Sequence, residues 1–126
     1  GSIWDSRAGM PGSGTILPLM LSEGYHRLGI PIEQIADLTS GNAARIFGLY
    51  PRKGAILPGS DADLVVVDLE REVDFQPEMI AVDFSPLTGM RFKGWPVMTI
   101  VAGKIAMEDG KVTAEPGLAQ YLAGTG

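Results

Sequence analysis

The apolar residues change their spacing once along this 126-residue chain, near Pro51, and that change limits the folds that are open to it. Before Pro51, apolar residues recur every three to four positions, which is typical of helices that bury one face. After it, residues 64–67 form a continuous run of Leu and Val, as in a strand buried on both faces. A self-contained parallel sheet would alternate strands with helices, so helices first and strands last predict an α+β fragment of a larger fold.

The first predicted helix follows a glycine-rich stretch. Its inward stripe has spacings of three and four and consists of Leu17, Met20, Leu21, Tyr25 and Leu28. We expect Thr15 to be its N-cap and Gly29 to end it.

Two shorter helices are predicted next. Pro31 suits the first turn of the second helix. The inward residues of that helix are expected to be Ile32, Ile35 and Ala36. Either Ser40 or Asn42 can cap a third helix, which would run through Phe47 and stop at Gly48.

The second half predicts strands separated by turns. A weaker strand is expected at residues 72–75, after the run at 64–67, and residues 77–93 form a long excursion. Residues 97–101 and 104–108 are expected to form a hairpin. The hairpin turn is Ala102-Gly103, a second tight turn is Asp109-Gly110, and Val112 is expected to continue the sheet. Residues 114–126 form a loosely held tail in which one helical turn at 118–122 is possible.

Composition excludes several classes of protein. Ten Lys and Arg against fifteen Asp and Glu give a net charge of −5, and the basic residues are scattered, which argues against binding to nucleic acid or to an anionic membrane. The absence of Cys excludes disulfides, thiolate catalysis and Cys-bound zinc. No apolar run is long enough to span a membrane, and we expect a cytoplasmic protein. Residues 1–2, Gly-Ser, are interpreted as a cloning scar.

Single polar residues do not make a catalytic set. His26 is the only histidine, so a place on a helix face is expected rather than a metal site, which needs several ligands. Asp61 and Asp63 precede a strand, where Asp usually fixes a turn through its own backbone, and catalysis is the less favoured reading. Arg52 and Lys53 are interpreted as a solvated turn.

The glycine-rich stretch at residues 9–15 is the other candidate. It runs into a helix and can present backbone N–H groups to an anion or polar ligand, although plain helix entry is the more common role of such a stretch. No Gly-Lys-Ser/Thr follows, so it is not a phosphate-binding loop of the Walker A type. Ser13 does not fit a nucleophile elbow because Pro11 occupies the first glycine position.

Several runs of residues together resemble the late part of the cyclic amidohydrolases. They are Ile-Trp-Asp at 3–5, Gly-Met-Pro-Gly at 9–12, Phe-Gly-Leu-Tyr-Pro-Arg-Lys-Gly at 47–54, Gly-Ser-Asp-Ala-Asp-Leu-Val at 59–65 and Glu-Asp-Gly at 108–110. They look like the C-terminal signature of hydantoinases, dihydropyrimidinases, allantoinases and dihydroorotases. The run at 47–54 is the most specific, and the first run leans toward allantoinase.

The resemblance implies a metal-dependent (β/α)₈ barrel that hydrolyses a ring amide C–N bond. In this family two divalent ions, expected to be zinc, are held by histidines, a carbamylated lysine and an aspartate that all lie upstream, so no catalytic residue and no metal ligand is expected in this chain. A loop that holds the substrate through main-chain atoms resembles Ala8, Gly9 and Gly12. Such a backbone edge suits a ring with alternating N–H and C=O groups.

The resemblance also implies a division of the chain. Residues 3–54 would be the last barrel loop and terminal helices, residues 55–113 the C-terminal strands of a small composite β-sandwich, and residues 114–126 a tail. The fragment is expected to be inactive alone, and the parent to be a homo-oligomer acting on a small cyclic amide. The alternative is a non-catalytic oligomerising scaffold of the same fold, which would lack the upstream His-x-His pair and lysine.

Two positions depart from the family pattern. Relatives usually have Glu or Gln where Gly14 stands, which bears on the ring that is bound. They usually have Asn-Pro where Asn42-Ala43 stands, and we expect this to affect only helix capping, since Asn42 can still cap.

Overall fold

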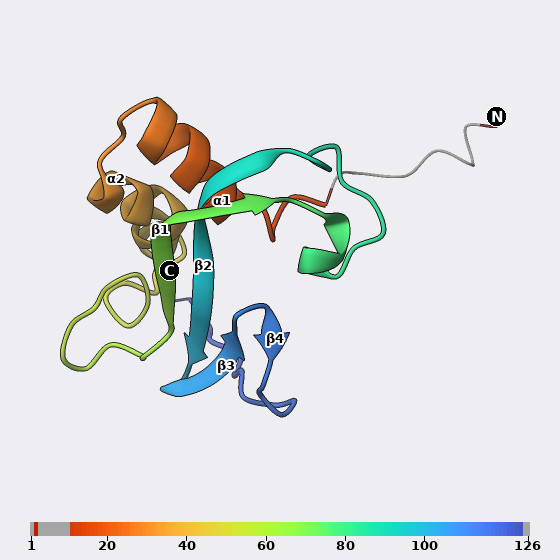
Figure 1. The fold of residues 1–126 in the computed structure, drawn as a ribbon. Coiled ribbons are helices and arrows are strands. Elements are labelled where there is room, and N and C mark those ends of the chain that lie inside the picture. Colours follow the sequence, from red (N-terminus) through yellow and green to blue (C-terminus); the bar gives the residue numbers. More distant parts are fainter. Residues whose placement is uncertain (1, 3–10, 125–126) are drawn as a thin grey trace.

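The computed structural model describes residue 2 and residues 11–124. Helices come first and a single antiparallel sheet of four strands follows, so the α+β class is confirmed (Figure 1). The strands lie side by side in chain order, β1-β2-β3-β4. An alternating parallel sheet is therefore excluded for the described part of the chain, as the single change of spacing predicts.

The first helix is found where it is predicted, but its inward stripe differs from the prediction: Leu21 is buried, whereas Leu28 is 61% exposed, and the other buried positions are Pro18, Ser22 and Gly24. The α-helix α1 (Ile16–Leu19) continues directly into a π-helical segment, η2 (Met20–Arg27), and Gly29 follows with a φ of 70°. Thr15 stands at the N-cap position, as predicted, but its side chain makes no capping hydrogen bond. Its backbone is already helical, with φ −108° and ψ −8°, and its hydroxyl donates backward to the carbonyl oxygen of Gly12 at 3.0 Å.

The second and third predicted helices are one continuous helix. It consists of α2 (Ile32–Ala36), the π-helical segment η3 (Asp37–Gly41) and α3 (Asn42–Ile46). A cap at Ser40 or Asn42 is therefore wrong. The Asn42 side chain instead accepts a hydrogen bond from Arg45 within the helix at 3.1 Å, so the departure from Asn-Pro does not affect a cap.

The buried stripe of this long helix also differs from the prediction. Pro31 lies just before the first turn with an extended ψ of 144°. Ile35 and Ala44 are buried, whereas Ala36 is exposed. The inward stripe runs from Ile35 through Gly41 to Ala44, because the π-helical segment between them changes the angular spacing.

The strands are longer than predicted because they pair with each other. The strand β1 (Leu64–Asp74) joins the two predicted strands, and β2 (Arg91–Val101) begins within the expected excursion. They are antiparallel from Leu64 opposite Ile100 to Asp74 opposite Arg91, with irregular register between Asp68 and Glu72. Backbone groups on both strands need partners, and each strand supplies them for the other.

Burial of β1 on both faces is a wrong prediction for this chain. Val65 and Val66 are 48% and 45% exposed. In the described structure β1 pairs only with β2 and lies at the edge of the sheet, so the apolar run at 64–67 is only partly covered.

The remaining excursion is a closed loop with its base in the core. It contains the 3₁₀ helix η4 (Pro77–Ile80). The N–H of Phe75 donates to the carbonyl of Met90, and the N–H of Gly89 donates to the carbonyl of Phe75, both at 2.9 Å. Phe75 is fully buried against Phe92, edge to face, with the ring centroids 5.7 Å apart.

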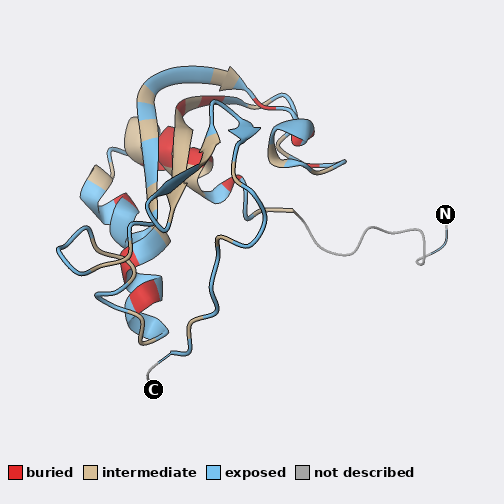
Figure 2. Cartoon of the chain, turned by 90° about the horizontal axis from the view of Figure 1, so that it is seen from below, coloured by how far each residue is buried: buried red, intermediate tan, exposed pale blue. Residues whose placement is uncertain are grey.

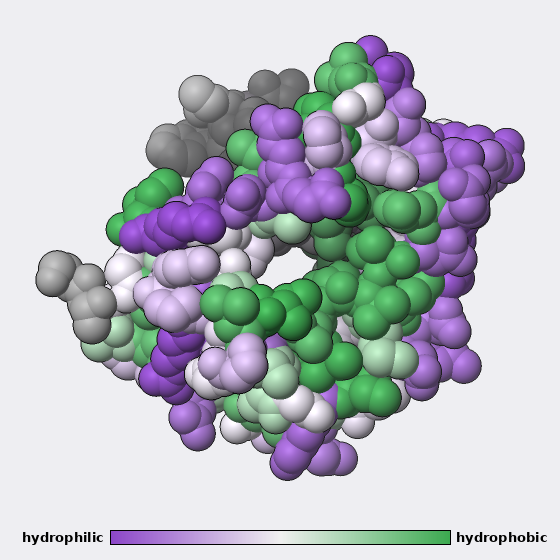
Figure 3. Space-filling view, turned by 90° about the vertical axis from the view of Figure 1, so that its left-hand side faces the viewer, coloured by the Kyte–Doolittle hydropathy of each residue, from purple (hydrophilic) through white to green (hydrophobic). Residues whose placement is uncertain are grey.

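The core lies between the first helix and the sheet (Figure 2). Its fully buried members are Pro18, Leu21, Ile35, Phe75 and Phe92, and burial is otherwise incomplete over much of the described chain. One face shows apolar side chains gathered around a hollow (Figure 3). None of the helices among residues 11–124 is long and apolar enough to cross a membrane.

The predicted turns are confirmed. Ala102 and Gly103 have φ values of 49° and 76°, and they join β2 to β3 (Lys104–Glu108). Asp109-Gly110 joins β3 to β4 (Lys111–Val112), in which Val112 pairs with Met107. The prediction of a helical turn at 118–122 is wrong. These residues have no helical structure and run back toward residues 47–63, which link the helices to the sheet and which we call the link.

Candidate functional site

The turn that enters the first helix contains one of the three predicted substrate-binding residues. Ala8 and Gly9 lie outside the described residues. The carbonyl oxygen of Gly12 accepts hydrogen bonds from the N–H groups of Thr15 and Ile16, at 3.0 and 3.1 Å. The turn is therefore tied to the start of α1, and the Gly12 carbonyl is already engaged within it.

A second polar cluster links the helices to the sheet, and we call it the ion-pair clamp: Arg52, Lys53, Asp61 and Asp63. Both Arg52 Nε and Lys53 Nζ lie 3.0 Å from Asp61 Oδ2, and Lys53 Nζ also contacts Asp63 Oδ2. The other carboxylate oxygen of Asp63 accepts a hydrogen bond from the N–H of Ala102 at 2.7 Å.

The backbone holds the two halves of the clamp together. Residues 52–53 and 61–63 are separated by a loop whose ends meet, because Ser60 Oγ donates to the carbonyl of Pro51 at 2.7 Å and the N–H of Asp61 donates to the carbonyl of Arg52 at 2.9 Å. The N–H of Gly103 donates to the carbonyl of Ala62 at 2.9 Å. The clamp thus joins the end of the helical half to the β2–β3 turn.

The charges of the clamp stabilise each other. The N–H of Ala102 and then the Lys53 ammonium hold the pKa of Asp63 below its ordinary value. Lys53 and then Arg52 hold the pKa of Asp61 below its ordinary value. The two carboxylates, Asp63 first, raise the pKa of Lys53. At neutral pH the carboxylates are ionised and the lysine is protonated, so none of them is suited to general acid or base catalysis.

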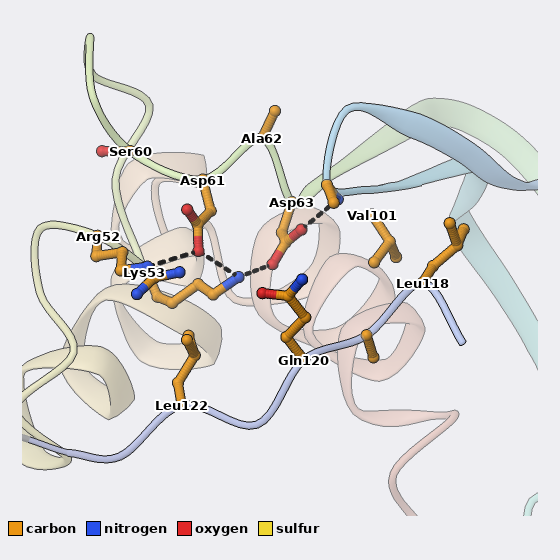
Figure 4. A pocket seen from close by; sticks show the side chains of 12 residues that line it. Arg52, Lys53, Ser60, Asp61, Ala62, Asp63, Val101, Leu118, Gln120 and Leu122 are labelled. Atoms are coloured by element: carbon orange, nitrogen blue, oxygen red, sulfur yellow. Dashed lines mark hydrogen bonds and ion pairs between the residues drawn. The ribbon is translucent and has the colours of Figure 1, made fainter. Parts of the chain in front are cut away.

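A pocket of about 430 Å³ borders the clamp, and the tail forms its other wall (Figure 4). Leu118, Gln120 and Leu122 line it from the tail. Because the clamp charges are paired with one another, its arrangement favours a structural role. The preference for a structural reading of Asp61 and Asp63 is consistent with this geometry. Arg52 and Lys53 do lie in a turn, and the Arg52 side chain is 56% exposed, but both cations are also paired with acids, which the interpretation as a solvated turn did not include.

His26 also has a structural contact. Its Nε2 donates to the carbonyl oxygen of Leu69 in β1 at 2.7 Å, and its ring lies edge to face with that of Tyr25. This bond fastens the first helix to the strand. Within the described residues, no group of three or more His, Cys, Asp or Glu side chains is placed to hold a metal ion.

Sequence reasoning missed the pairing of Arg52 and Lys53 with Asp61 and Asp63. A signal was present: two adjacent cations precede two acids by about ten residues, and Pro58-Gly59 between them favours a loop that returns. The hydrogen bond from the N–H of Ala102 to the Asp63 carboxylate had no such signal, since it joins positions 39 residues apart.

The chain is similar in sequence to known proteins over most of its length. Residues 5–106 match the amidohydrolase family. The L-hydantoinase of Paenarthrobacter aurescens is 35% identical over 122 residues, which are 95% of this chain and 27% of that relative. The allantoinase of Rubrobacter xylanophilus is 41% identical over 110 residues, 86% of this chain and 24% of that relative.

Solved structures agree with the sequence comparison. The structure of an L-hydantoinase (dihydropyrimidinase) from Arthrobacter aurescens superposes with a TM-score of 0.86 at 34% identity, over 94% of this chain and 27% of that one. A D-hydantoinase crystal structure gives a TM-score of 0.81 at 36% identity, over 86% of this chain and 24% of that one. The chain spans about a quarter of the length of these relatives.

These matches define the class of protein: the chain belongs to the amidohydrolase family. Within that family it is similar to hydantoinases, dihydropyrimidinases and allantoinases, which confirms the resemblance inferred from the run at 47–54 and its neighbours.

Proposed function

We propose that this chain is the C-terminal segment of a metal-dependent cyclic amidohydrolase that hydrolyses a ring amide C–N bond in an allantoin-, hydantoin- or dihydroorotate-like substrate. The observation that carries the proposal is the continuity of the likeness. It extends over 86–95% of the chain at 35–41% identity to proteins named L-hydantoinase and allantoinase, and it is accompanied by a TM-score of 0.86.

The proposal divides the work between this chain and the rest of the polypeptide. Residues 3–54 are the last barrel loop and terminal helices, residues 55–113 are strands of a composite β-sandwich, and residues 114–126 are a tail. In the described residues the only histidine bonds a backbone carbonyl and the clamp carboxylates are held by cations. These donors do not fit a metal pair, so we place the metal, expected to be zinc, on residues outside this chain and assign it no step here.

The contribution of this chain to the reaction is to hold the substrate through backbone groups of Ala8, Gly9 and Gly12. Because the Gly12 carbonyl accepts bonds from Thr15 and Ile16, Gly12 contacts the ring through its N–H. A ring that presents alternating N–H and C=O groups is recognised by such a main-chain edge without any charged side chain. The chain alone is then inactive.

A segment exchange tests this function. Residues 3–124 replace the matching C-terminal quarter of the P. aurescens L-hydantoinase, and hydrolysis of hydantoin, allantoin and dihydroorotate is measured. The control hybrid carries the same segment from the D-hydantoinase of Geobacillus stearothermophilus, which is 35% identical to this chain over 119 residues.

We expect the hybrid to hydrolyse at least one of the rings, because the exchanged segment supplies the same loop and the same packing. A hybrid that folds and binds metal like the control, yet hydrolyses none of the three rings, would contradict the proposal. It would favour a non-catalytic scaffold of the same fold.

A further inference from the structure

The turn before the first helix rests on a residue that is distant in the sequence. A Cβ atom added to Gly14 would lie 2.8 Å from Cγ2, 2.9 Å from Cβ and 3.3 Å from Cδ1 of Ile80. Real Cβ atoms essentially never approach other heavy atoms as closely as the first two distances. The backbone of Gly14 is therefore in direct contact with the Ile80 side chain, and Figure 1 shows the turn beside η4.

The element that carries Ile80 is held firmly. The loop containing η4 is closed at its base by the two hydrogen bonds of Phe75, a residue with no exposed surface. At the other side of the loop, Ser85 is only 3% exposed. Its Oγ accepts a hydrogen bond from the N–H of Leu87, and its carbonyl oxygen accepts one from the Thr88 hydroxyl at 2.6 Å. Ile80 thus presents a fixed apolar surface to Gly14.

The turn itself is held from two sides. The N–H groups of Thr15 and Ile16 bond the carbonyl of Gly12, and Ile80 contacts the next glycine, Gly14. The position of the Gly12 backbone therefore depends on the volume of the side chain at position 80. A larger residue at position 14, where relatives of this family usually carry Glu or Gln, would need a different partner there.

We propose that Ile80 is a positioning residue that sets the ring preference of the substrate-binding turn by supporting Gly14. This rests on the function proposed above. Five-membered and six-membered cyclic amides place their N–H and C=O groups at different spacings, so a backbone edge displaced by a fraction of an ångström discriminates between them. A misplacement of about 1 Å can cost about 100-fold in rate.

The test uses the complete polypeptide that contains this segment, assayed with hydantoin as the five-membered ring and dihydrouracil as the six-membered ring. Ile80→Ala removes Cγ2 and Cδ1 and lets the turn settle toward η4. Ile80→Val keeps Cβ and Cγ2, the two closest atoms, and is the conservative variant. Gly14→Ala pushes the turn away from η4. Met79→Ala is the matched control, because Met79 lies on η4 and is 49% exposed.

We expect Ile80→Ala and Gly14→Ala each to change the ratio of the two kcat/KM values by about tenfold, mainly through KM. Ile80→Val and Met79→Ala should leave that ratio within about twofold of the wild type. Thermal melting of each variant distinguishes a displaced turn from loss of folding, and Gly14→Ala provides the test if Ile80→Ala does not fold.

The outcomes separate the two proposals. An active wild type whose ring preference is unchanged in both Ile80→Ala and Gly14→Ala overturns the role of Ile80 alone. Equal shifts in Met79→Ala overturn it as well, because the effect would then belong to η4 in general. A wild type that hydrolyses no cyclic amide overturns the proposed function and the role of Ile80 with it.

Discussion

Asp63 has the most demanding set of partners among the clamp residues. One carboxylate oxygen accepts the N–H of Ala102 and the other contacts Lys53. Ala102 has a φ of 49°, a conformation that costs a non-glycine residue free energy, so a bond to its N–H holds the β2–β3 turn in place. The clamp therefore affects stability through one backbone contact more than through its charges.

Replacing this residue gives a first prediction. Asp63→Ala should lower the free energy of unfolding by about 1 kcal/mol, a value below the range for hydrogen bonds to charged groups because the Asp63 side chain is 35% exposed. Urea denaturation measures the difference. In the control Asp74→Ala, which removes an ion pair to Arg91 of 3.7 Å between side chains that are both more than two-thirds exposed, the change should be much smaller.

The same difference should depend on pH with a definite sign. The pKa of Asp63 is lowered in the folded state, so its contribution is complete above the ordinary pKa of Asp, about 4, and is lost as the pH falls through the lower folded value. The wild type and Asp63→Ala should therefore differ equally at about pH 7 and about pH 5, and converge below about pH 4. A difference that persists unchanged at about pH 2 would contradict the clamp.

At the scale of elements, the contact between the long helix and the link after it depends on Gly54. A Cβ at Gly54 would lie 2.6 Å from the Cβ of Ala44 and 3.1 Å from the Cα of Gly41, and its φ is 76°. Gly59 has a φ of 93° but no heavy atom within 4 Å of the corresponding position. The two glycines share the conformational requirement and differ in packing.

This pair gives the second prediction. Gly59→Ala should cost about 1 kcal/mol, from the left-handed backbone alone. Gly54→Ala should cost about 3 kcal/mol, because displacement of the helix against Ala44 adds to the same strain. Thermal unfolding of both variants measures the two losses. Equal losses would mean that the helix does not pack against the link as described.

The sequence predicted elements well where local signals decide them. The place of the first helix and the turns at Ala102-Gly103 and Asp109-Gly110 depend on neighbouring residues, and all three are found. The ends of the strands were predicted less well, because the length of β1 depends on its pairing with β2. No local pattern at residues 91–96 carries that information.

The helix cap and the site show the same limit. Asn42 has the residue type of a cap, but its side chain bonds Arg45 inside a continuous helix. In the candidate site, the glycine turn could be recognised from its composition and family pattern, whereas its contact with Ile80 joins positions 66 residues apart and had no signal in a single sequence. The roles of Ala8 and Gly9 stay predictions.

At the scale of the whole molecule, the described chain leaves much apolar surface open. Ile46, Phe47, Ile56 and Val112 are between 68% and 85% exposed, and β1 is an edge strand. Apolar side chains surround the hollow on the face in Figure 3. A soluble monomer rarely exposes a large contiguous apolar patch, and an edge strand can pair with another chain.

The third prediction is that copies of the 126-residue chain associate. Light scattering coupled to size-exclusion chromatography should show a mass above 13.4 kDa that rises with protein concentration. The substitution Val65→Lys should weaken the association, because it places a charge on the edge strand. A monomer at all concentrations would contradict this account of the open surface.

We propose that this chain completes a cyclic amidohydrolase and is inactive alone. The most direct measurement compares the complete polypeptide with the 126-residue chain, in bound metal by mass spectrometry and in hydrolysis of allantoin, hydantoin and dihydroorotate. We predict metal and turnover of at least one ring in the complete polypeptide, and neither in the chain alone. Stoichiometric metal and turnover in the chain alone would contradict the claim, and would require His26, Asp61 and Asp63 to form a site that their present contacts do not allow.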